Sequence, residues 1–170
     1  MGRFSGAQTV EDLEKRIARL EDVEAITNLF TQYAHYCDDG YDAKGMGTLF
    51  VEDAVWESNA FGVYKSRDEF KQFISDIGKS LVWALHYMIA PEIDVAVNGQ
   101  SAIGRFYLLE LGTMTGVEDP NSRDAVIITA NYDNTFVKVD GEWKIKSVKV
   151  HFHQVSNLDL GWVKQPFRGE

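Results

Sequence analysis

The feature that most constrains the fold is a set of four long strand-like segments in the second half of the chain. They cover residues 82–97, 101–115, 125–139 and 142–154, so that each holds 13 to 16 residues. Asn98-Gly99 and Asp140-Gly141 separate neighbouring segments, and both dipeptides are strong signals for tight hairpin turns. Strands of this length twist, and a long twisted sheet has to curl. We therefore expect a curled, mainly antiparallel sheet whose concave face is covered by helices.

The segment before these strands has helical periodicity. Thr9 can cap a helix in which apolar residues recur at steps of three and four as far as Cys37. Glu21 and Asp22 are compatible with a break between two helices, and Gly40 favours termination after the stripe.

Shorter elements follow between this region and the long strands. We expect a helix over 43–50, a small hairpin from 51–58 and 61–65, and a helix that Ser66 caps. Pro91 predicts a bulge or an edge position in the first long strand. Helices, a hairpin and then antiparallel strands predict an α+β fold, a cone with three to four helices over a curved sheet that encloses a cavity.

Length and charge limit the classes of protein. The chain of 170 residues is long enough for one compact domain, which we expect to span 1–170 with a C-terminal tail at 155–170. The formal net charge of −9 argues against nucleic acid and anionic membranes as partners. The longest apolar run, 81–90, is interrupted by His86 and is too short for a membrane span. A single cysteine, Cys37, excludes an internal disulfide framework and fits a cytoplasmic protein.

His86 is the residue with the clearest chemical potential. It lies within the apolar segment 82–89, where Trp83, Leu85 and Tyr87 share one face and both faces have the composition of buried surface. A buried imidazole needs a hydrogen-bond partner, and a carboxylate partner would decide its protonation state. The residue pattern alone leaves two interpretations, a satisfied core histidine and a catalytic acid or base.

Other polar residues in the strands have several interpretations. His151 and His153 share one face of the last segment and could begin a metal site with His86, or they could line a cavity as polar groups. Glu110 and Asn131 are polar residues that interrupt apolar strands. Each of them could line a pocket, lie at a sheet edge or take part in a contact between subunits. On a helical wheel Asp38 falls off the apolar stripe of its helix, which places it outside.

Taken together, the chain resembles the SnoaL-like branch of the NTF2-like superfamily, which includes scytalone dehydratase, the lindane dehydrochlorinase and the bile-acid 7α-dehydratase. The resemblance covers about residues 10–154. It rests on DVEAI at 22–26, DDG at 38–40, LHY at 85–87, PEI at 91–93 and DGEWKI at 140–145. It implies an α+β cone with one deep apolar pocket, no cofactor and no metal. Several members are trimers, so that it also implies a homo-oligomer, a trimer or a dimer.

The resemblance also implies roles for individual residues. Asp38 and His86 stand where the lyase members pair an aspartate with a histidine, and Tyr33 stands five residues before the aspartate as in the bile-acid enzyme. His86 would take a proton from carbon, Asp38 would fix its tautomer, and Tyr33 would donate a hydrogen bond to a carbonyl or leaving oxygen. This implication overrides the helical wheel for Asp38.

We therefore predict a cofactor-independent lyase that carries out a dehydratase-type elimination on a small hydrophobic ringed or aromatic molecule, as in the catabolism of aromatic compounds. The residues expected to bind the substrate are Trp56, Trp83, Phe106, Tyr107, Asn131, His151 and His153. Two alternatives stay open. The same pair could serve an isomerase or a carbon–carbon lyase, for example on lignin-derived aromatics, and the fold also hosts non-catalytic binding modules.

Overall fold

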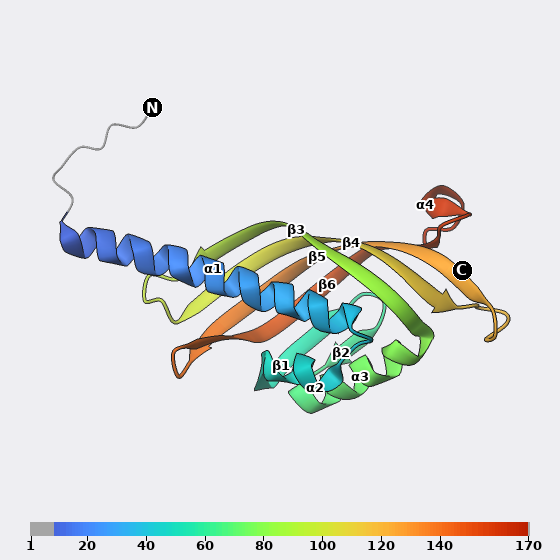
Figure 1. The fold of residues 1–170 in the computed structure, drawn as a ribbon, viewed down its shortest axis with the longest axis horizontal. Helices are drawn as coiled ribbons and strands as arrows, with labels where there is room; N and C mark the ends of the chain where they lie inside the picture. Colours follow the sequence, from blue (N-terminus) through green and yellow to red (C-terminus); the bar gives the residue numbers. More distant parts are fainter. Residues whose placement is uncertain (1–8, 170) are drawn as a thin grey trace.

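The computed structural model describes residues 9–169. Its elements, in chain order, are α1 Val10–Asp38, α2 Ala43–Thr48, β1 Phe50–Ser58, β2 Gly62–Tyr64, α3 Arg67–Ser80, β3 Leu81–Val95, β4 Ser101–Thr115, β5 Arg123–Val139, β6 Glu142–Asn157 and α4 Gly161–Lys164 (Figure 1). The prediction of helices and a small hairpin before long strands is confirmed.

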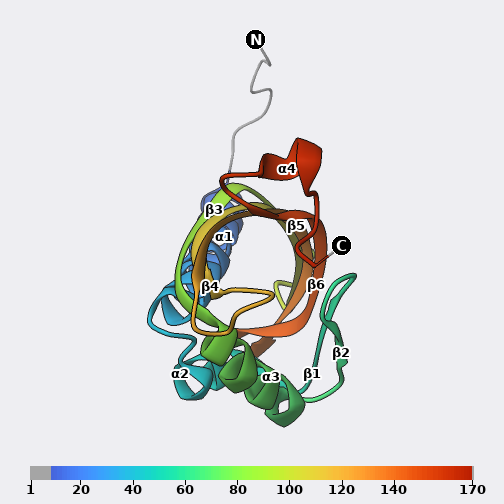
Figure 2. The same cartoon turned by 90° about the vertical axis from the view of Figure 1, so that its right-hand side faces the viewer.

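A single six-stranded sheet forms the body of the structure, in the order β2-β1-β6-β5-β4-β3. All pairs of neighbouring strands are antiparallel except β1 and β6, which are parallel, so that the sheet is mixed. Viewed along its length, the sheet curls nearly into a ring, with α1 along one side and α3 below it (Figure 2). The predicted α+β cone with helices over a curved sheet is confirmed.

Helix α1 is continuous, so the predicted break at Glu21 and Asp22 is wrong. Asp22 instead accepts hydrogen bonds from Lys138 Nζ at 2.6 Å and from Trp143 Nε1 at 2.8 Å, which join the middle of the helix to the sheet. The Thr9 capping box is confirmed. Among residues 9–169, every helix is too short or too polar to span a lipid bilayer.

The two halves of α1 have different surroundings. Its C-terminal half buries Ile26, Phe30 and Cys37 in the core, where the Phe30 ring packs on those of Phe106 and Tyr132. Its N-terminal half projects past the sheet (Figure 1), so that the apolar side chains there stay exposed. The half of the helix that packs on the sheet is therefore the half that ends at Asp38.

The long strands alternate between an inner, buried face and an outer face. In β4 and β5 the even-numbered residues from Ala102 to Gly112 and from Val126 to Phe136 are buried. β3 departs from the expectation that both of its faces are buried, because Trp83 and Tyr87 are 51% and 47% exposed. Between the two register shifts of β3, its inner face is formed by Ala84, His86 and Met88.

The turns and the bulge follow the sequence signals. Gly99 and Gly141 have φ of 65° and 85°, the left-handed region that glycine adopts without steric cost. The register of β3 against β4 shifts between Ile89 and Glu92, beside Pro91, as expected for a bulge.

The C-terminal segment differs from the prediction in its start. β6 continues to Asn157, so that the segment after the sheet begins later than the expected tail at 155–170. Phe167 pairs with Val155 and packs on the core, whereas Trp162 is 56% exposed. Residues 1–8 and 170, which the predicted domain includes, lie outside the described residues.

Candidate active site

A mainly apolar cavity lies at the inner face of the sheet, between α1, α3 and the strands. The volume of this cavity is about 50 Å³. Aromatic and aliphatic side chains form most of the wall. The polar or titratable groups in the wall are Tyr33, Cys37, Tyr41, His86, Glu110 and Tyr132. A mainly apolar lining with a few polar groups is typical of a site for a small hydrophobic molecule.

Asp38 and His86 form a close pair at this cavity. One carboxylate oxygen of Asp38 lies 2.7 Å from His86 Nδ1 and also accepts the backbone N–H of His86 at 2.9 Å. A carboxylate oxygen that accepts from the backbone is also an acceptor for the ring, so Nδ1 carries a hydrogen. The His86 side chain is only 4% exposed. The imidazole is therefore fixed in orientation and in tautomer.

The end of α1 explains how Asp38 reaches the strand. Asp38 is the last residue of the helix, and Gly40 and Tyr41 follow with φ of 66° and 60°, which turn the chain back. Positive φ is uncommon for a residue with a side chain and is found at functional sites. The helical wheel, which placed Asp38 outside, is therefore misleading at this helix end. The Asp38 side chain is 21% exposed.

Glu110 lies on the opposite side of the imidazole. The register places it directly opposite His86 across the β3–β4 ladder, and its Oε2 is 3.3 Å from His86 Nε2. The Tyr41 hydroxyl lies 3.5 Å from Glu110 Oε1. Burial raises the pKa of Glu110, and the charge of Asp38 adds to this effect. Burial opposes the imidazolium, but Glu110 and Asp38 together raise the pKa of His86 above its usual value.

Tyr33 and Trp56 lie in the wall of the cavity, as predicted for a hydrogen-bond donor and a substrate contact. Trp56 Nε1 donates to the Tyr33 hydroxyl oxygen at 3.2 Å. Burial raises the pKa of Tyr33 well above its usual value, so that the phenol keeps its proton near neutral pH. The Tyr33 hydroxyl is thus available as a donor toward a molecule in the cavity.

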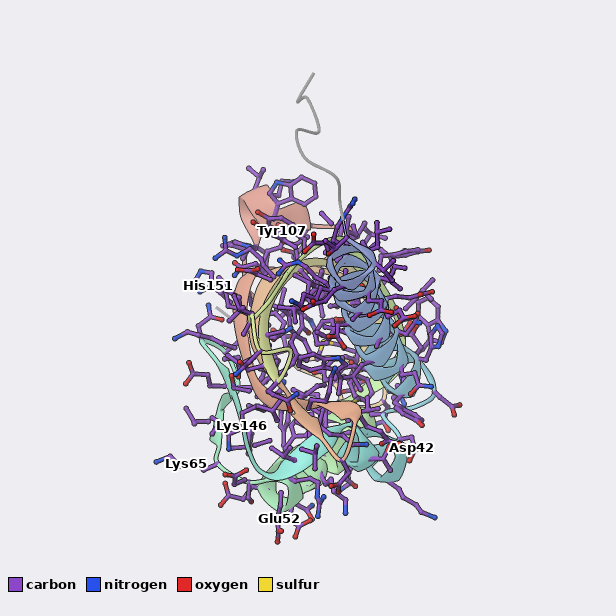
Figure 3. All side chains as sticks on the ribbon, turned by 90° about the vertical axis from the view of Figure 1, so that its left-hand side faces the viewer. Asp42, Glu52, Lys65, Tyr107, Lys146 and His151 are labelled. Carbon is purple, nitrogen blue, oxygen red and sulfur yellow. The ribbon has the colours of Figure 1, made fainter. Side chains whose placement is uncertain are left out.

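The other predicted substrate contacts lie away from this cavity. Trp83 and Tyr107 are each 51% exposed on the outer face. Asn131 also has outer-face parity, and it donates a hydrogen bond to Asp133. His151 and His153 are exposed, as Figure 3 shows for His151. The physical reason is strand parity, since successive side chains alternate between the two faces.

Phe106 and the histidine cluster also differ from the prediction. Phe106 faces inward, but it packs on Phe30 in the core instead of lining the cavity. His86 lies on the inner face of the sheet, whereas His151 and His153 lie on the outer face. These three residues therefore do not converge on a metal site.

Glu110 and Tyr41 are the site residues that the sequence analysis did not assign. A signal for Glu110 exists, because it shares parity with Phe106 and Leu108, and an acid on the buried face of a strand requires a polar partner. Tyr41 has no comparable signal. Its position depends on a left-handed backbone conformation after Gly40 that residue type does not indicate.

One end of the cavity borders a second hollow at the C-terminal segment. Phe61, Met114 and Val155 line both spaces, and Phe167 and Arg168 line the outer one. A molecule that enters from this side therefore passes between these side chains before it reaches His86.

Comparisons with known proteins agree with this architecture. The model of the SnoaL-like domain family matches residues 18–149. A candidate scytalone dehydratase from Novosphingobium aromaticivorans is 23% identical, with a TM-score of 0.74 over 91% of this chain and 98% of that one. The hexachlorocyclohexane dehydrochlorinase LinA-type3 from Novosphingobium barchaimii is 20% identical, with a TM-score of 0.72 over 84% and 94%. An NTF2-like protein with a cystatin-like fold from N. aromaticivorans is 21% identical, with a TM-score of 0.69 over 94% and 96%. At these identities the likeness establishes the shared fold.

Proposed function

Because the chain belongs to the family of SnoaL-like domains, we propose that it is a cofactor-independent lyase of the dehydratase type. The observation that carries the proposal is the contact of 2.7 Å between His86 Nδ1 and Asp38 Oδ1 at the wall of an apolar cavity. The structural relatives include a dehydrochlorinase and a candidate dehydratase, names that denote elimination reactions.

The pair has the properties that proton transfer to or from a substrate requires. Asp38 orients the imidazole of His86 and stabilises its protonated form, as the aspartate of a catalytic triad does. General acid–base catalysis contributes about 10²- to 10⁴-fold in rate, so positioning in the cavity has to supply the remainder. Tyr33 is the donor that would stabilise negative charge on a carbonyl or leaving oxygen.

The substrate class follows from the lining of the cavity. Trp56, Phe61 and Phe73 form an aromatic wall, and their rings pack on one another or on neighbouring rings. Such a wall favours flat or ringed molecules. The elimination itself requires an acidic C–H beside a carbonyl or aromatic ring, and a hydroxyl group on the neighbouring carbon.

The experiment is an activity screen with variants. We would incubate the full chain with ringed β-hydroxy ketones and follow the loss of water by mass spectrometry, for wild type, His86→Ala and Asp38→Asn. We expect turnover by the wild type, its loss in His86→Ala, and a fall of about 10²- to 10⁴-fold in Asp38→Asn. Melting temperatures should stay within a few degrees, which separates a chemical role from a role in folding.

Three outcomes contradict the proposal. Unchanged rates in both variants would remove the pair from the mechanism. A product with the mass of the substrate would indicate an isomerase, and loss of a carbon fragment would indicate a carbon–carbon lyase.

A homo-oligomer is a separate part of the proposal. Trp83 and Tyr87 on β3 and Tyr107 on β4 leave about half of their surfaces exposed, at 51%, 47% and 51%. Exposed apolar surface on adjacent strands is typical of an interface between chains. Light scattering should give the mass of a trimer or a dimer, and a monomer at tens of micromolar protein would contradict this part.

A further inference from the structure

A second carboxylate lies on the side of His86 that a substrate would have to use. Asp38 occupies Nδ1, and Glu110 Oε2 lies 3.3 Å from Nε2, the nitrogen that faces away from Asp38. The side chains of His86 and Glu110 are each only 4% exposed, and both residues line the cavity. The imidazole is thus held between two carboxyl groups, one from α1 and one from the neighbouring strand β4.

Hydrogen counting limits the protonation states of this group. Nδ1 carries a hydrogen because Asp38 accepts there. Nε2 and Glu110 Oε2 lie 3.3 Å apart, so a positive charge on the ring and a negative charge on the carboxyl stabilise each other, and near neutral pH the state with one proton between the two groups is favoured. The group then has a net charge of −1, either as imidazolium with two carboxylates or as neutral imidazole with one protonated carboxyl.

Asp38, which is included in this net charge, is the charged group beside the pair of His86 and Glu110. The other titratable groups that face the pair are Tyr33 and Cys37 from α1, Tyr41 from the turn after it, and Tyr132 from β5. Burial raises the pKa of each of them well above its usual value, so that all four are neutral near pH 7. His86 and Glu110 therefore exchange a proton in apolar surroundings, where the charge of each residue strongly affects the protonation of the other.

We propose that Glu110 is a catalytic residue of the elimination and that it works as the base while His86 works as the acid. This inference rests on the proposed function and assigns the direction of proton transfer within the same site. In the reactive state Asp38 and Glu110 are carboxylates and His86 is imidazolium. Glu110 takes the proton from carbon, the C–H electron pair forms the double bond, and the C–O bond to the leaving hydroxyl breaks.

His86 completes the reaction. Once Glu110 is neutral, it no longer attracts the charge of the imidazolium, and Nε2–H protonates the leaving hydroxyl to give water. The site then holds neutral His86 and protonated Glu110. Transfer of that proton across the contact between Oε2 and Nε2 restores the reactive state, so that no proton is gained or lost in the cycle. The raised pKa makes Glu110 a stronger base than an exposed carboxylate.

The first test measures the shared proton without any substrate. Imidazole ¹⁵N NMR follows His86 from pH 4 to 10 in the wild type, Glu110→Gln and the control Asp133→Asn, an outward-facing acid on β5. Removal of the Glu110 charge should lower the pKa of His86 by about one unit or more. Asp133→Asn should leave it unchanged. An unchanged pKa in folded Glu110→Gln overturns the inference.

The second test identifies the base with 5-nitrobenzisoxazole, a small aromatic probe that loses a proton from carbon and releases a coloured phenolate without help from an acid. We expect Glu110→Gln to lose about 10²-fold or more in kcat/KM. His86→Gln should lose less, because the phenolate needs no proton to leave. Asp133→Asn should keep the wild-type rate.

The outcomes separate this inference from the proposed function. The first outcome is that kcat/KM of Glu110→Gln stays within threefold of the wild-type value while His86→Gln and Asp38→Asn lose activity. In that case Asp38 and His86 act without Glu110, and the proposed role of Glu110 is wrong. If the wild type does not accelerate the probe, or if all three variants match it, both the elimination and the role of Glu110 are contradicted.

Discussion

The inner and outer faces of β3 and β4 have similar compositions, but their side chains have different surroundings. Both faces carry large apolar residues, yet His86 and Glu110 on the inner face have side chains that are 4% exposed, whereas Trp83 and Tyr107 on the outer face are 51% exposed. The inner face is covered by the C-terminal half of α1, and the outer face is open in the single chain (Figure 2).

The difference shows that strand register decides which residues take part in the site. A shift of one residue would exchange the two faces, because the side-chain period of a strand is two. His86 and Glu110 are register partners, so the β3–β4 ladder places the Glu110 carboxyl beside Nε2 of the His86 ring. The bulge beside Pro91 lies beyond this pair and leaves its register unchanged.

The largest effect should come from truncation of an inner side chain. Phe136 is 0% exposed, and Phe136→Ala should lower the free energy of unfolding by about 3–5 kcal/mol, because it leaves a cavity in the core. Its neighbour Thr135 points outward, and Thr135→Ala should cost less than about 1 kcal/mol. Urea unfolding of both variants measures the contrast. Equal losses of unfolding free energy in the two variants would contradict the assignment of Phe136 to the buried inner face and Thr135 to the outer face.

A smaller effect should appear in the pH dependence of stability. The pKa of Glu110 is raised in the folded state, so between about 4.5 and that raised pKa the folded chain holds a proton that the unfolded chain has released. The stabilisation that Glu110 contributes is therefore fully present below pH 4.5 and is lost as the pH rises. The loss is at most about 1.4 kcal/mol of unfolding free energy per pH unit. The raised pKa of His86 acts in the same direction above pH 6.5.

Chemical denaturation from pH 5 to 8 checks this prediction. Glu110→Gln should show a shallower decline than the wild type, because glutamine does not titrate. Asp133→Asn on the outer face should follow the wild-type slope. A slope for Glu110→Gln equal to that of the wild type would mean that Glu110 has the same pKa in both states.

The sequence predicts the fold well because its signals are local. Asn98-Gly99, Asp140-Gly141 and the helix caps at Thr9 and Ser66 each specify a turn or a helix start from a few adjacent residues. The break expected at Glu21 and Asp22 was wrong because Asp22 is held by Lys138 and Trp143, partners that are distant in sequence.

The site is only partly predictable, for a related reason. The pairing of Asp38 with His86 came from the family resemblance, since periodicity placed Asp38 outside. In β3 both faces are apolar in sequence, so no alternation shows which side the helix covers, and Trp83 was assigned to the wrong face. Glu110 had the correct parity, but only the strand register shows that it meets Nε2 of His86.

The smallest effect should come from the outer-face histidines. His151 and His153 are exposed, and their rings contact each other at a centroid distance of 5.4 Å. We expect His151→Gln and His153→Gln to change the free energy of unfolding by less than about 0.5 kcal/mol, because neither ring is buried. Turnover of any substrate found by the screen should also be unchanged, since the sheet separates both rings from His86.

Trp56→Ala removes a wall of the cavity and should raise KM. Measured together with this variant, the histidine variants test directly which face of the sheet binds the substrate. A raised KM in either histidine variant would return substrate binding to the outer face.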